Sequence, residues 1–285
     1  MNKKEIIHTF FNRRIGVLAT MHHKEKVMSP LLEEQLGIKI KVPINLDTDQ
    51  FGTFTRDIER VGDQAETAKL KARYAIELSG ETLAIASEGV FGPHPVMPWL
   101  PYNREMVFLL DQENKFELFG EAITTDTNYQ YLPMKSREEA YAFCEAVGFP
   151  EHAVVVRANH EIIKGIIEKE QLDEVMTYMQ NKYSNEEVII ETDMRALYNP
   201  TRMKHIQAAT EDLIRKIYSL CSRCSYPGFE VVERREGLLC RCCGLKTKLI
   251  QAEIYRCKKC GEIEERLYPS GKQFADPSQC FFCNP

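Results

Sequence analysis

The chain has 285 residues and a mass of 32.9 kDa, enough for one large domain and a small second one. Its 44% hydrophobic and 28% charged residues exclude the low-complexity and collagen-like classes, and its net charge of −5 argues against a general binder of nucleic acid. No apolar run approaches the roughly 20 residues that span a bilayer, and the start of the chain lacks the apolar stretch of a signal peptide. We therefore expect a cytoplasmic protein that does not associate with membranes.

Apolar patterning along the chain predicts strands that alternate with helices. Each predicted strand is a short apolar run, and each predicted helix is a longer stretch of good helix formers, one of which stops before Gly80. This alternation favours an α/β domain with a mixed sheet over residues 1–219. The expected strands cover 14–20, 38–46, 82–87, a hairpin over 105–124, 152–159 and 187–194, and the expected helices end near 36 or cover about 65–78, 135–147, 169–183 and 200–219.

Polar residues follow several of these strands. Thr20, Asp49, Glu88 and Asp193 each lie where a predicted strand gives way to a loop, and the strand before Glu88 is expected to end there. In open α/β sheets, ligands bind outside the carboxyl ends of the strands. Carboxylates that converge there suit Mg²⁺, so Asp49 and Glu88 are predicted magnesium ligands, and Glu88 and Asp193 are predicted catalytic acids.

Basic and amide side chains near the same strand ends are candidates for binding phosphate. The loop from His22 to Lys26 opens a helix, whose first N–H groups favour an anion. Arginine adds planar, paired hydrogen bonds to phosphate. Solvated surface positions for the lysines, including a snorkelling Lys71 inside a helix, are the competing interpretation. The candidates are Thr20, His22, Lys24, Lys26, Arg195, Asn199 and Arg202.

Two segments of the chain resemble the inosine triphosphate pyrophosphatase family. VLATMHHKEKVMSPLLEEQLGI resembles its opening strand and phosphate loop, and ETAKLKARYAIELSGETLAIASEG is similar to its next helix and strand, in the same order over about residues 14–95. Later, NPTRMKHIQAATEDL stands in the place of that family's Ser-His-Arg helix start, where Arg202 corresponds to the arginine. The whole chain also resembles an uncharacterised bacterial family with a double zinc-knuckle tail.

The resemblance to the pyrophosphatases implies an elongated mixed sheet with a central cleft, and Mg²⁺-dependent cleavage of a nucleoside triphosphate to a monophosphate and pyrophosphate. It implies that Thr20 and Lys24 contact the triphosphate, that Glu88 is the catalytic acid, and that Asp49 or Asp47 binds the metal. The sequence departs from that family at Ser87, where the family has the first of two adjacent acids. We therefore expect a nucleoside triphosphate pyrophosphatase or a related phosphate-ester hydrolase, with a nucleotide-binding module without catalysis as the alternative.

Nine of the ten cysteines lie after residue 220, eight of them in four Cys-x-x-Cys knuckles. Zinc binds four thiolates in a tetrahedron, and two cysteines three residues apart supply one edge of it. The segments between the knuckles read as strands, so residues 220–285 are predicted to form a zinc-ribbon module with two structural zinc ions. A disulfide framework is the competing interpretation. The predicted ligands are Cys221, Cys224, Cys240, Cys243, Cys257, Cys260, Cys280 and Cys283.

The spacing leaves open which knuckles share a zinc ion. Sequential pairing, first with second and third with fourth, and nested pairing, second with third and first with fourth, both fit. We expect Cys242 not to be a ligand and Cys144 to be a core residue. The tail has more basic than acidic residues, but two sites of four thiolates and one divalent ion each offset that excess. We therefore expect the tail to dock a protein partner or to stabilise the chain, with nucleic-acid binding as the alternative.

Overall fold

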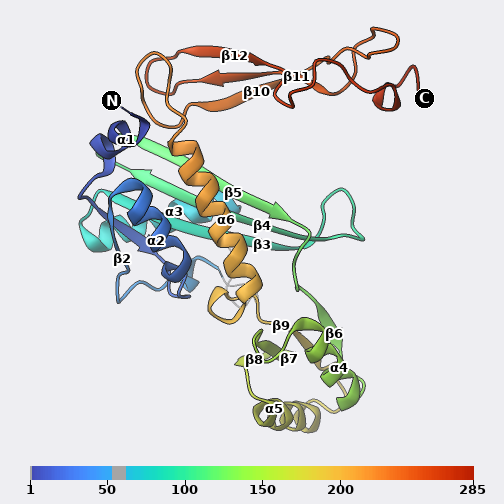
Figure 1. The fold of residues 1–285 in the computed structure, drawn as a ribbon. Helices are drawn as coiled ribbons and strands as arrows, with labels where there is room; N and C mark the ends of the chain where they lie inside the picture. The colour runs from blue at the N-terminus through green and yellow to red at the C-terminus, as the bar shows by residue number, and fades with distance from the viewer. Residues whose placement is uncertain (1, 53–61) are drawn as a thin grey trace. The chain divides into compact units, whose positions relative to one another are not determined.

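The computed structural model describes residues 2–52 and 62–285 (Figure 1). The described chain divides into two compact units. The larger unit is residues 11–214, and the smaller unit combines the residues up to Phe10 with residues 215–285. No helix in the described part of the chain combines the length and the low polarity needed to cross a bilayer.

The larger unit contains a five-stranded sheet with the strand order β2-β1-β3-β4-β5. β1 is parallel to both β2 and β3, whereas β3, β4 and β5 form antiparallel pairs. This is a mixed sheet of the kind that the alternation of strands and helices predicts. The strands are β1 (Ile15–Ala19), β2 (Lys39–Lys41), β3 (Leu83–Pro93), β4 (Pro101–Asp111) and β5 (Phe116–Thr124).

β3 is longer than the sequence predicts. It continues through Glu88 to Pro93, because this part pairs in register with β4, so the prediction of a strand end at Glu88 is wrong. β1 ends earlier, at Ala19, opposite Ala86 of β3. The polar residues that follow Ala86 on β3 therefore lie beyond the end of its parallel neighbour.

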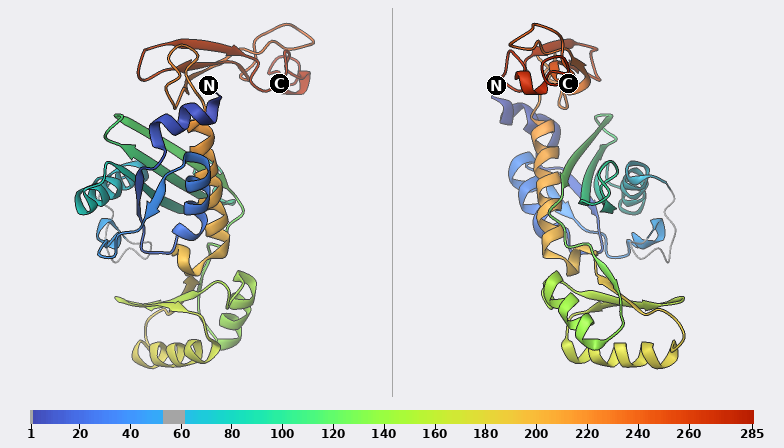
Figure 2. Two further views of the ribbon diagram at one scale, coloured as in Figure 1. Left: turned by 60° about the vertical axis from the view of Figure 1, so that its left-hand side comes forward. Right: turned by 90° about the vertical axis from the view of Figure 1, so that its right-hand side faces the viewer.

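Three helices cover the two faces of this sheet. The alanines of α3 (Gln64–Ser79) pack on one face, against residues that include Ala84, Ala86 and Phe108. α2 (Glu25–Leu36) and α6 (Pro200–Ile217) lie on the opposite face (Figure 2). Strand alternation therefore directs the even-numbered residues of β3 toward α3 and the odd-numbered ones toward α2 and α6.

Local sequence signals set where these helices begin and end. α3 starts after Asp63, whose side chain accepts a hydrogen bond from the N–H of Glu66, and it ends at Gly80 in the left-handed conformation. α6 starts at Pro200, and Oδ1 of the preceding Asn199 accepts a hydrogen bond from the N–H of Arg202 at 2.9 Å. A side-chain acceptor followed by proline is a favoured way to start a helix.

A second sheet follows along the chain, antiparallel throughout, with the order β6-β9-β7-β8. The sequence predicts its two helices and two of its strands but not that they form a separate sheet. Cys144 is buried in its apolar core, and burial raises the pKa of this thiol to about 11, as expected of a core residue rather than a nucleophile. The elements are β6 (Tyr131–Pro133), α4 (Arg137–Val147), β7 (Val154–Ala158), β8 (Glu161–Ile166), α5 (Lys169–Lys182) and β9 (Ile189–Thr192).

The smaller unit contains a three-stranded antiparallel meander with the order β10-β11-β12. The N-terminal helix α1 (Lys3–Phe11) contributes Phe10, whose ring meets that of Tyr226 edge-on at 5.7 Å. The strands are β10 (Glu230–Glu236), β11 (Ile250–Arg256) and β12 (Ile263–Leu267), and the chain also contains the short 3-10 helices η1 (Asp49–Phe51), η2 (Ala196–Tyr198) and η3 (Pro277–Gln279).

Candidate metal centres and a buried charge cluster

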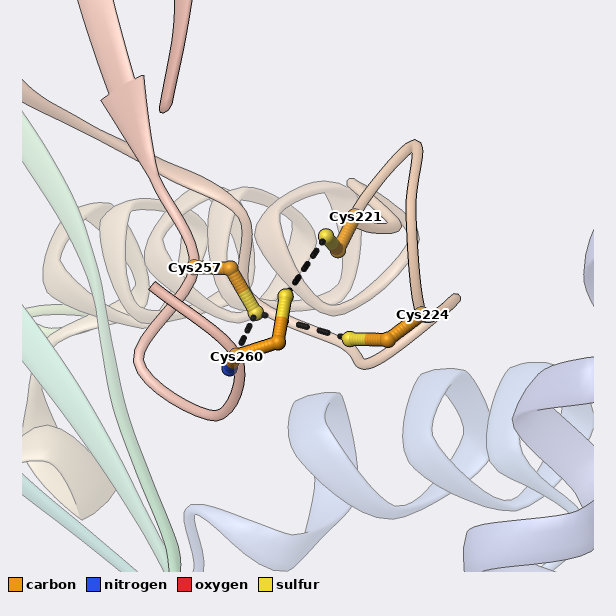
Figure 3. A group of neighbouring side chains, drawn as sticks. All are labelled: Cys221, Cys224, Cys257 and Cys260. Carbon is orange, nitrogen blue, oxygen red and sulfur yellow. Dashed lines mark hydrogen bonds between the residues drawn. The ribbon is translucent and has the colours of Figure 1, made fainter. Parts of the chain in front are cut away.

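Eight cysteines of the smaller unit form two groups of four, each of which could hold a zinc ion. In each group, the four Sγ atoms lie within 4.8 Å of one another. Figure 3 shows the sulfur atoms of the first group pointing toward one another. The first tetrad consists of Cys221, Cys224, Cys257 and Cys260, and the second tetrad consists of Cys240, Cys243, Cys280 and Cys283.

The distances between sulfur atoms match a tetrahedral zinc site. With Zn–S bonds of about 2.3 Å, two ligands of a regular tetrahedron lie about 3.8 Å apart. In the first tetrad, the Sγ atoms of Cys221 and Cys260 lie 3.7 Å apart, and in the second, those of Cys243 and Cys280 lie 3.6 Å apart. A disulfide needs about 2.05 Å, so these sulfur atoms are spaced as metal ligands and not as disulfides. All the cysteines are free, and Cys242 lies outside both tetrads.

The knuckles combine in neither of the two ways considered from the sequence. The first knuckle joins the third, and the second joins the fourth. The meander explains this pairing, because the chain runs along β10 to the far end of the sheet, returns along β11 and leaves again along β12. Alternate knuckles therefore meet at the same end of the sheet, and the two zinc positions lie at opposite ends.

A backbone hydrogen bond closes each knuckle. The residue after the second cysteine donates its N–H to the carbonyl oxygen of the first cysteine, as Gly244 does to Cys240 at 3.0 Å. Gly244 and Gly261 do so with positive φ, which glycine adopts without strain. The N–H groups of Cys243 and Cys242 also lower the pKa of the Cys240 thiol, which favours the thiolate that zinc binds, whereas the pKa values of Cys243 and Cys283 in the same tetrad are raised.

The larger unit contains a cluster of buried charges that gathers residues from two helices, two strands and the position just before α2. Its cations are only 5–7% exposed, which is rare for lysine and arginine. Burying a charge is unfavourable unless a partner or a ligand compensates it. We call these residues the charge cluster: Lys24, Lys71, Ser87, Glu88, Glu105 and Arg202.

Two ion pairs of the charge cluster lie on opposite faces of β3. Lys71 of α3 pairs with Glu88, on the face that α3 covers. On the other face, Nε of Arg202 donates to Oε1 of Glu105 at 2.8 Å, and Nη1 of Arg202 donates to the carbonyl oxygen of Met194 at 2.5 Å. Each of these carboxylates thus has a cation beside it.

Lys24 lies between the two pairs, where β1 has ended and β3 continues. Its Nζ donates to the carbonyl oxygen of Ser87 at 3.2 Å and to Oγ of the same residue at 2.9 Å. Burial lowers the pKa of Lys24 to about 7, and the positive charges of Arg202 and Lys71 act in the same direction, against the weaker opposite effect of Glu88 and Glu105. The cluster therefore holds three basic side chains against two carboxylates.

The structure brings only some of the predicted site residues together. Lys24, Glu88 and Arg202 belong to the charge cluster. Thr20 is buried at the end of β1, where its Oγ1 accepts a hydrogen bond from the N–H of His22 at 3.2 Å. Lys26, by contrast, is exposed. The side chain of Asp49, the second predicted magnesium ligand, lies outside the described residues.

The remaining predicted residues hold the chain that leads into α6. The buried carboxylate of Asp193 accepts hydrogen bonds from the N–H of Gly165 and from the guanidinium of Arg195, which lies 2.6 Å away. Arg195 also stacks over Tyr198 at 4.7 Å. Asn199 caps α6 and donates to Oδ1 of Asn128. These contacts position the start of α6, and with it Arg202.

Two charged members of the cluster, Lys71 and Glu105, were not among the predicted site residues. Lys71 lies on the buried face of α3 with Ala68, Ala72 and Ala75, and a lysine that shares a helix face with several alanines could have been recognised as buried. Glu105 begins an apolar strand segment but has no local signal, because its partner Arg202 is far away in the sequence. Glu105 and Arg202 come together only because Glu105 pairs with Gly89 in the sheet and α6 places Arg202 beside them.

The tetrads and most of the charge cluster fall within a segment shared with other proteins. No curated protein sequence matches the chain. Residues 71–285, which include Lys71, Glu88, Glu105, Arg202 and both tetrads, match a family described as a domain of unknown function (DUF6671). This segment makes up most of the chain, and the protein therefore belongs to that family.

Proposed function

We propose that the charge cluster binds the phosphates of a nucleoside triphosphate, and that the chain hydrolyses this nucleotide to a monophosphate and pyrophosphate. The observation that carries the proposal is the convergence of Lys24, Lys71 and Arg202, all nearly inaccessible to solvent, around only two carboxylates. The order of the motifs over residues 14–95, which resembles that of the inosine triphosphate pyrophosphatases, supports the same substrate class.

An anionic ligand would compensate the charge that the protein leaves unbalanced. Glu88 neutralises Lys71, and Glu105 neutralises Arg202, but the hydrogen-bond partners of Lys24 are the two neutral oxygens of Ser87. The low pKa of Lys24 reflects this environment. A phosphate beside Nζ would favour the protonated amine, and the energy of that interaction would contribute to binding.

The pyrophosphatase resemblance implies Mg²⁺, and the residues present fit this ion in part. Mg²⁺ is commonly held by one or two carboxylates together with substrate phosphates and water, and Glu88 is the carboxylate that would hold it here. Among the described residues, the only groups of three or more candidate ligands are the cysteine tetrads, so the phosphates would have to complete the site. When bound, Mg²⁺ would neutralise charge on the phosphates.

Each residue of the charge cluster would have its own role in this reaction. The oxygen of a water molecule would form a bond to the α-phosphorus, and the bond from this phosphorus to the bridging oxygen would break, so that pyrophosphate leaves with the electron pair. Glu88 would orient the water and accept its proton. Lys24 and Arg202 would stabilise the negative charge that develops on the pyrophosphate.

The test is the release of pyrophosphate from a panel of purine and pyrimidine nucleoside triphosphates by the purified full-length chain in the presence of Mg²⁺. We expect release from at least one of them. Glu88→Gln should slow this release at least about 100-fold, because it removes the proton acceptor. Lys71→Met should also slow it, since it removes the partner of Glu88.

Lys69→Met is a matched control on the same helix. Lys69 is partly exposed, and its Nζ lies 5.8 Å from the ring centre of Phe119. This variant should keep the activity of the unmodified chain. Nucleotide binding without any release would identify a binding module that lacks catalysis, and neither binding nor release would contradict the whole proposal.

A further inference from the structure

The cations of the zinc module differ in whether they have a carboxylate partner. At one end, around the first tetrad, and along the three strands that connect the two ends, most cations pair with glutamates. Arg234 pairs with Glu253 at 3.0 Å, and Lys258 pairs with Glu230 at 3.0 Å. Arg223, Arg235 and Arg266 are likewise paired with glutamates.

The other end, which we call the second zinc end, consists of residues 237–249 and 268–285 around the second tetrad. It contains four exposed cations and one acidic side chain, Asp276. None of these cations forms a salt bridge in the described part of the chain. The four cations are Arg241, Lys246, Lys248 and Lys272.

Backbone contacts place these cations around the second tetrad. The N–H of Arg241 donates to the carbonyl oxygen of Ala275 at 3.0 Å, and Lys246 forms an isolated bridge with Leu239, next to Cys240. Arg241 and Lys272 both act electrostatically on the carboxylate of Asp276 and lower its pKa, after the larger effect of its hydrogen bonds with Ser278. The thiolates of a zinc-filled tetrad carry net negative charge, but the four cations and single acid leave an excess of positive charge at this end.

Two exposed phenylalanine rings lie at the same end. Phe281 is 88% exposed and Phe282 is 70% exposed, and both lie between the zinc ligands Cys280 and Cys283. The middle residues of the other three knuckles are Ser222-Arg223, Arg241-Cys242 and Lys258-Lys259. Exposing two adjacent large apolar rings on a small module is unfavourable in water and indicates a contact surface. Because both rings lie inside a metal-held knuckle, the backbone that carries them would lose little conformational entropy when a ligand covers them.

We infer that the second zinc end binds single-stranded nucleic acid, with bases stacked on Phe281 and Phe282 and phosphates contacted by the surrounding cations. Aromatic rings that stack on bases, beside cations that contact the backbone, are the two features that single-strand binding needs. A partner protein could cover the rings as well, but four cations without paired carboxylates favour a polyanion. Duplex DNA buries its base faces, so it would use the cations and not the rings.

The experiment measures the binding of the full-length, zinc-loaded chain to fluorescent oligouridine and oligothymidine of about 12 nucleotides, a length within the range of known single-strand sites. We expect both to bind at about 50 mM salt, because stacking does not depend on the sugar, and to bind more weakly as salt rises. A duplex of the same length should bind at least about ten-fold more weakly.

Substitutions distinguish the contribution of base stacking to the binding affinity from the contribution of the cations. Phe281→Ser with Phe282→Ser should weaken binding at least about ten-fold without changing the zinc content. Lys246→Gln with Lys272→Gln should weaken binding and reduce the slope of log affinity against log salt by about 0.7 for each phosphate that the variant no longer neutralises. Ile263→Ser, at an exposed apolar position of β12, and Arg234→Gln, at a paired cation, are the matched controls and should bind like the unmodified chain.

Three results would overturn the inference. The first is the absence of binding to either oligonucleotide at low salt, which would leave the rings as a contact for a protein. The second is unchanged affinity in the double phenylalanine variant, and the third is equal affinity for the duplex and the single strand. None of these results bears on pyrophosphate release, because the charge cluster belongs to the other unit.

Discussion

Gly89 of β3 lies opposite Glu105 of β4, and a Cβ atom at position 89 would lie 2.6 Å from Oε1 of that glutamate. The same atom would lie 2.7 Å from Nη2 of Arg202. Both distances are far shorter than the contact distance of non-bonded atoms. The missing side chain of Gly89 therefore makes the room in which the buried pair of Glu105 and Arg202 forms.

Gly89→Ala should break this pair or displace it. We expect the free energy of unfolding to fall by about 3 kcal/mol, from the loss of a buried ion pair and the crowding of a filled space. Urea denaturation measures the change. Gly80→Ala is the control, because its Cβ would meet nothing within 4 Å although φ is +71° there, and it should cost about 1 kcal/mol. An equal loss in both variants would contradict this account of Gly89.

Gly120→Ala should be more damaging, because β5 and α6 approach each other at this glycine. A Cβ atom at position 120 would lie 2.3 Å from the carbonyl oxygen of Ala209 and 2.3 Å from the backbone nitrogen of Leu213. Backbone atoms of a helix cannot turn aside as a side chain can, so α6 would have to move away from the sheet. We expect the free energy of unfolding, measured by thermal denaturation, to fall by at least about 3 kcal/mol. An unchanged melting temperature would show that α6 does not pack so closely here.

Zinc counts in double cysteine variants test how the knuckles are paired. Cys221→Ser with Cys257→Ser removes two ligands of one tetrad and should leave one zinc ion per chain, because the second tetrad stays complete. Cys221→Ser with Cys240→Ser damages both tetrads and should leave none tightly bound. Sequential pairing would reverse these two results. Nested pairing would leave no tightly bound zinc ion in either variant, because each would then damage both sites, so metal analysis distinguishes all three arrangements.

Stability should depend on pH through Lys24. Burial lowers the pKa of this lysine to about 7 in the folded chain, below its ordinary value. From about pH 7 to about pH 10, the unfolded chain therefore binds more protons than the folded chain, and the free energy of unfolding rises with pH. Lys24→Met removes this contribution. The stability of the variant relative to the unmodified chain should thus fall by a few kcal/mol as the pH rises through this window.

The control for this measurement is Lys26→Met, which changes an exposed lysine two residues away. Its stability relative to the unmodified chain should not vary with pH across the same window. If the stability of Lys24→Met relative to the unmodified chain also did not vary with pH, then Lys24 would keep its ordinary pKa and be accessible to water. Chemical denaturation at several pH values provides both comparisons.

Local patterns in the sequence predicted most of the helices and strands. Gly80 ends its helix as expected, because the left-handed turn after a helix is a property of one residue and its neighbours. The end of β3 was predicted wrongly, because Glu88 and Gly89 read as a turn. Their strand conformation comes from pairing with β4, which no local pattern reveals. Lys24 was recognised as a candidate from its place after the first strand, whereas Glu105 was not, since it joins the charge cluster only through its pairing with Arg202 of α6.

The spacing of the cysteines is enough to identify the eight residues that form the tetrads and the knuckle shape of each pair, because two ligands three residues apart are held together by the backbone between them. Which knuckles combine depends on the folded chain, because the antiparallel meander brings alternate knuckles to the same end of the sheet. The convergence of Lys71, Glu105 and Arg202 with Lys24 likewise depends on the fold. So does the difference, among the described residues, between the paired cations along the strands and the unpaired cations of the second zinc end. These depend on contacts between residues distant in sequence, where packing and strand register, not local preference, set the distances.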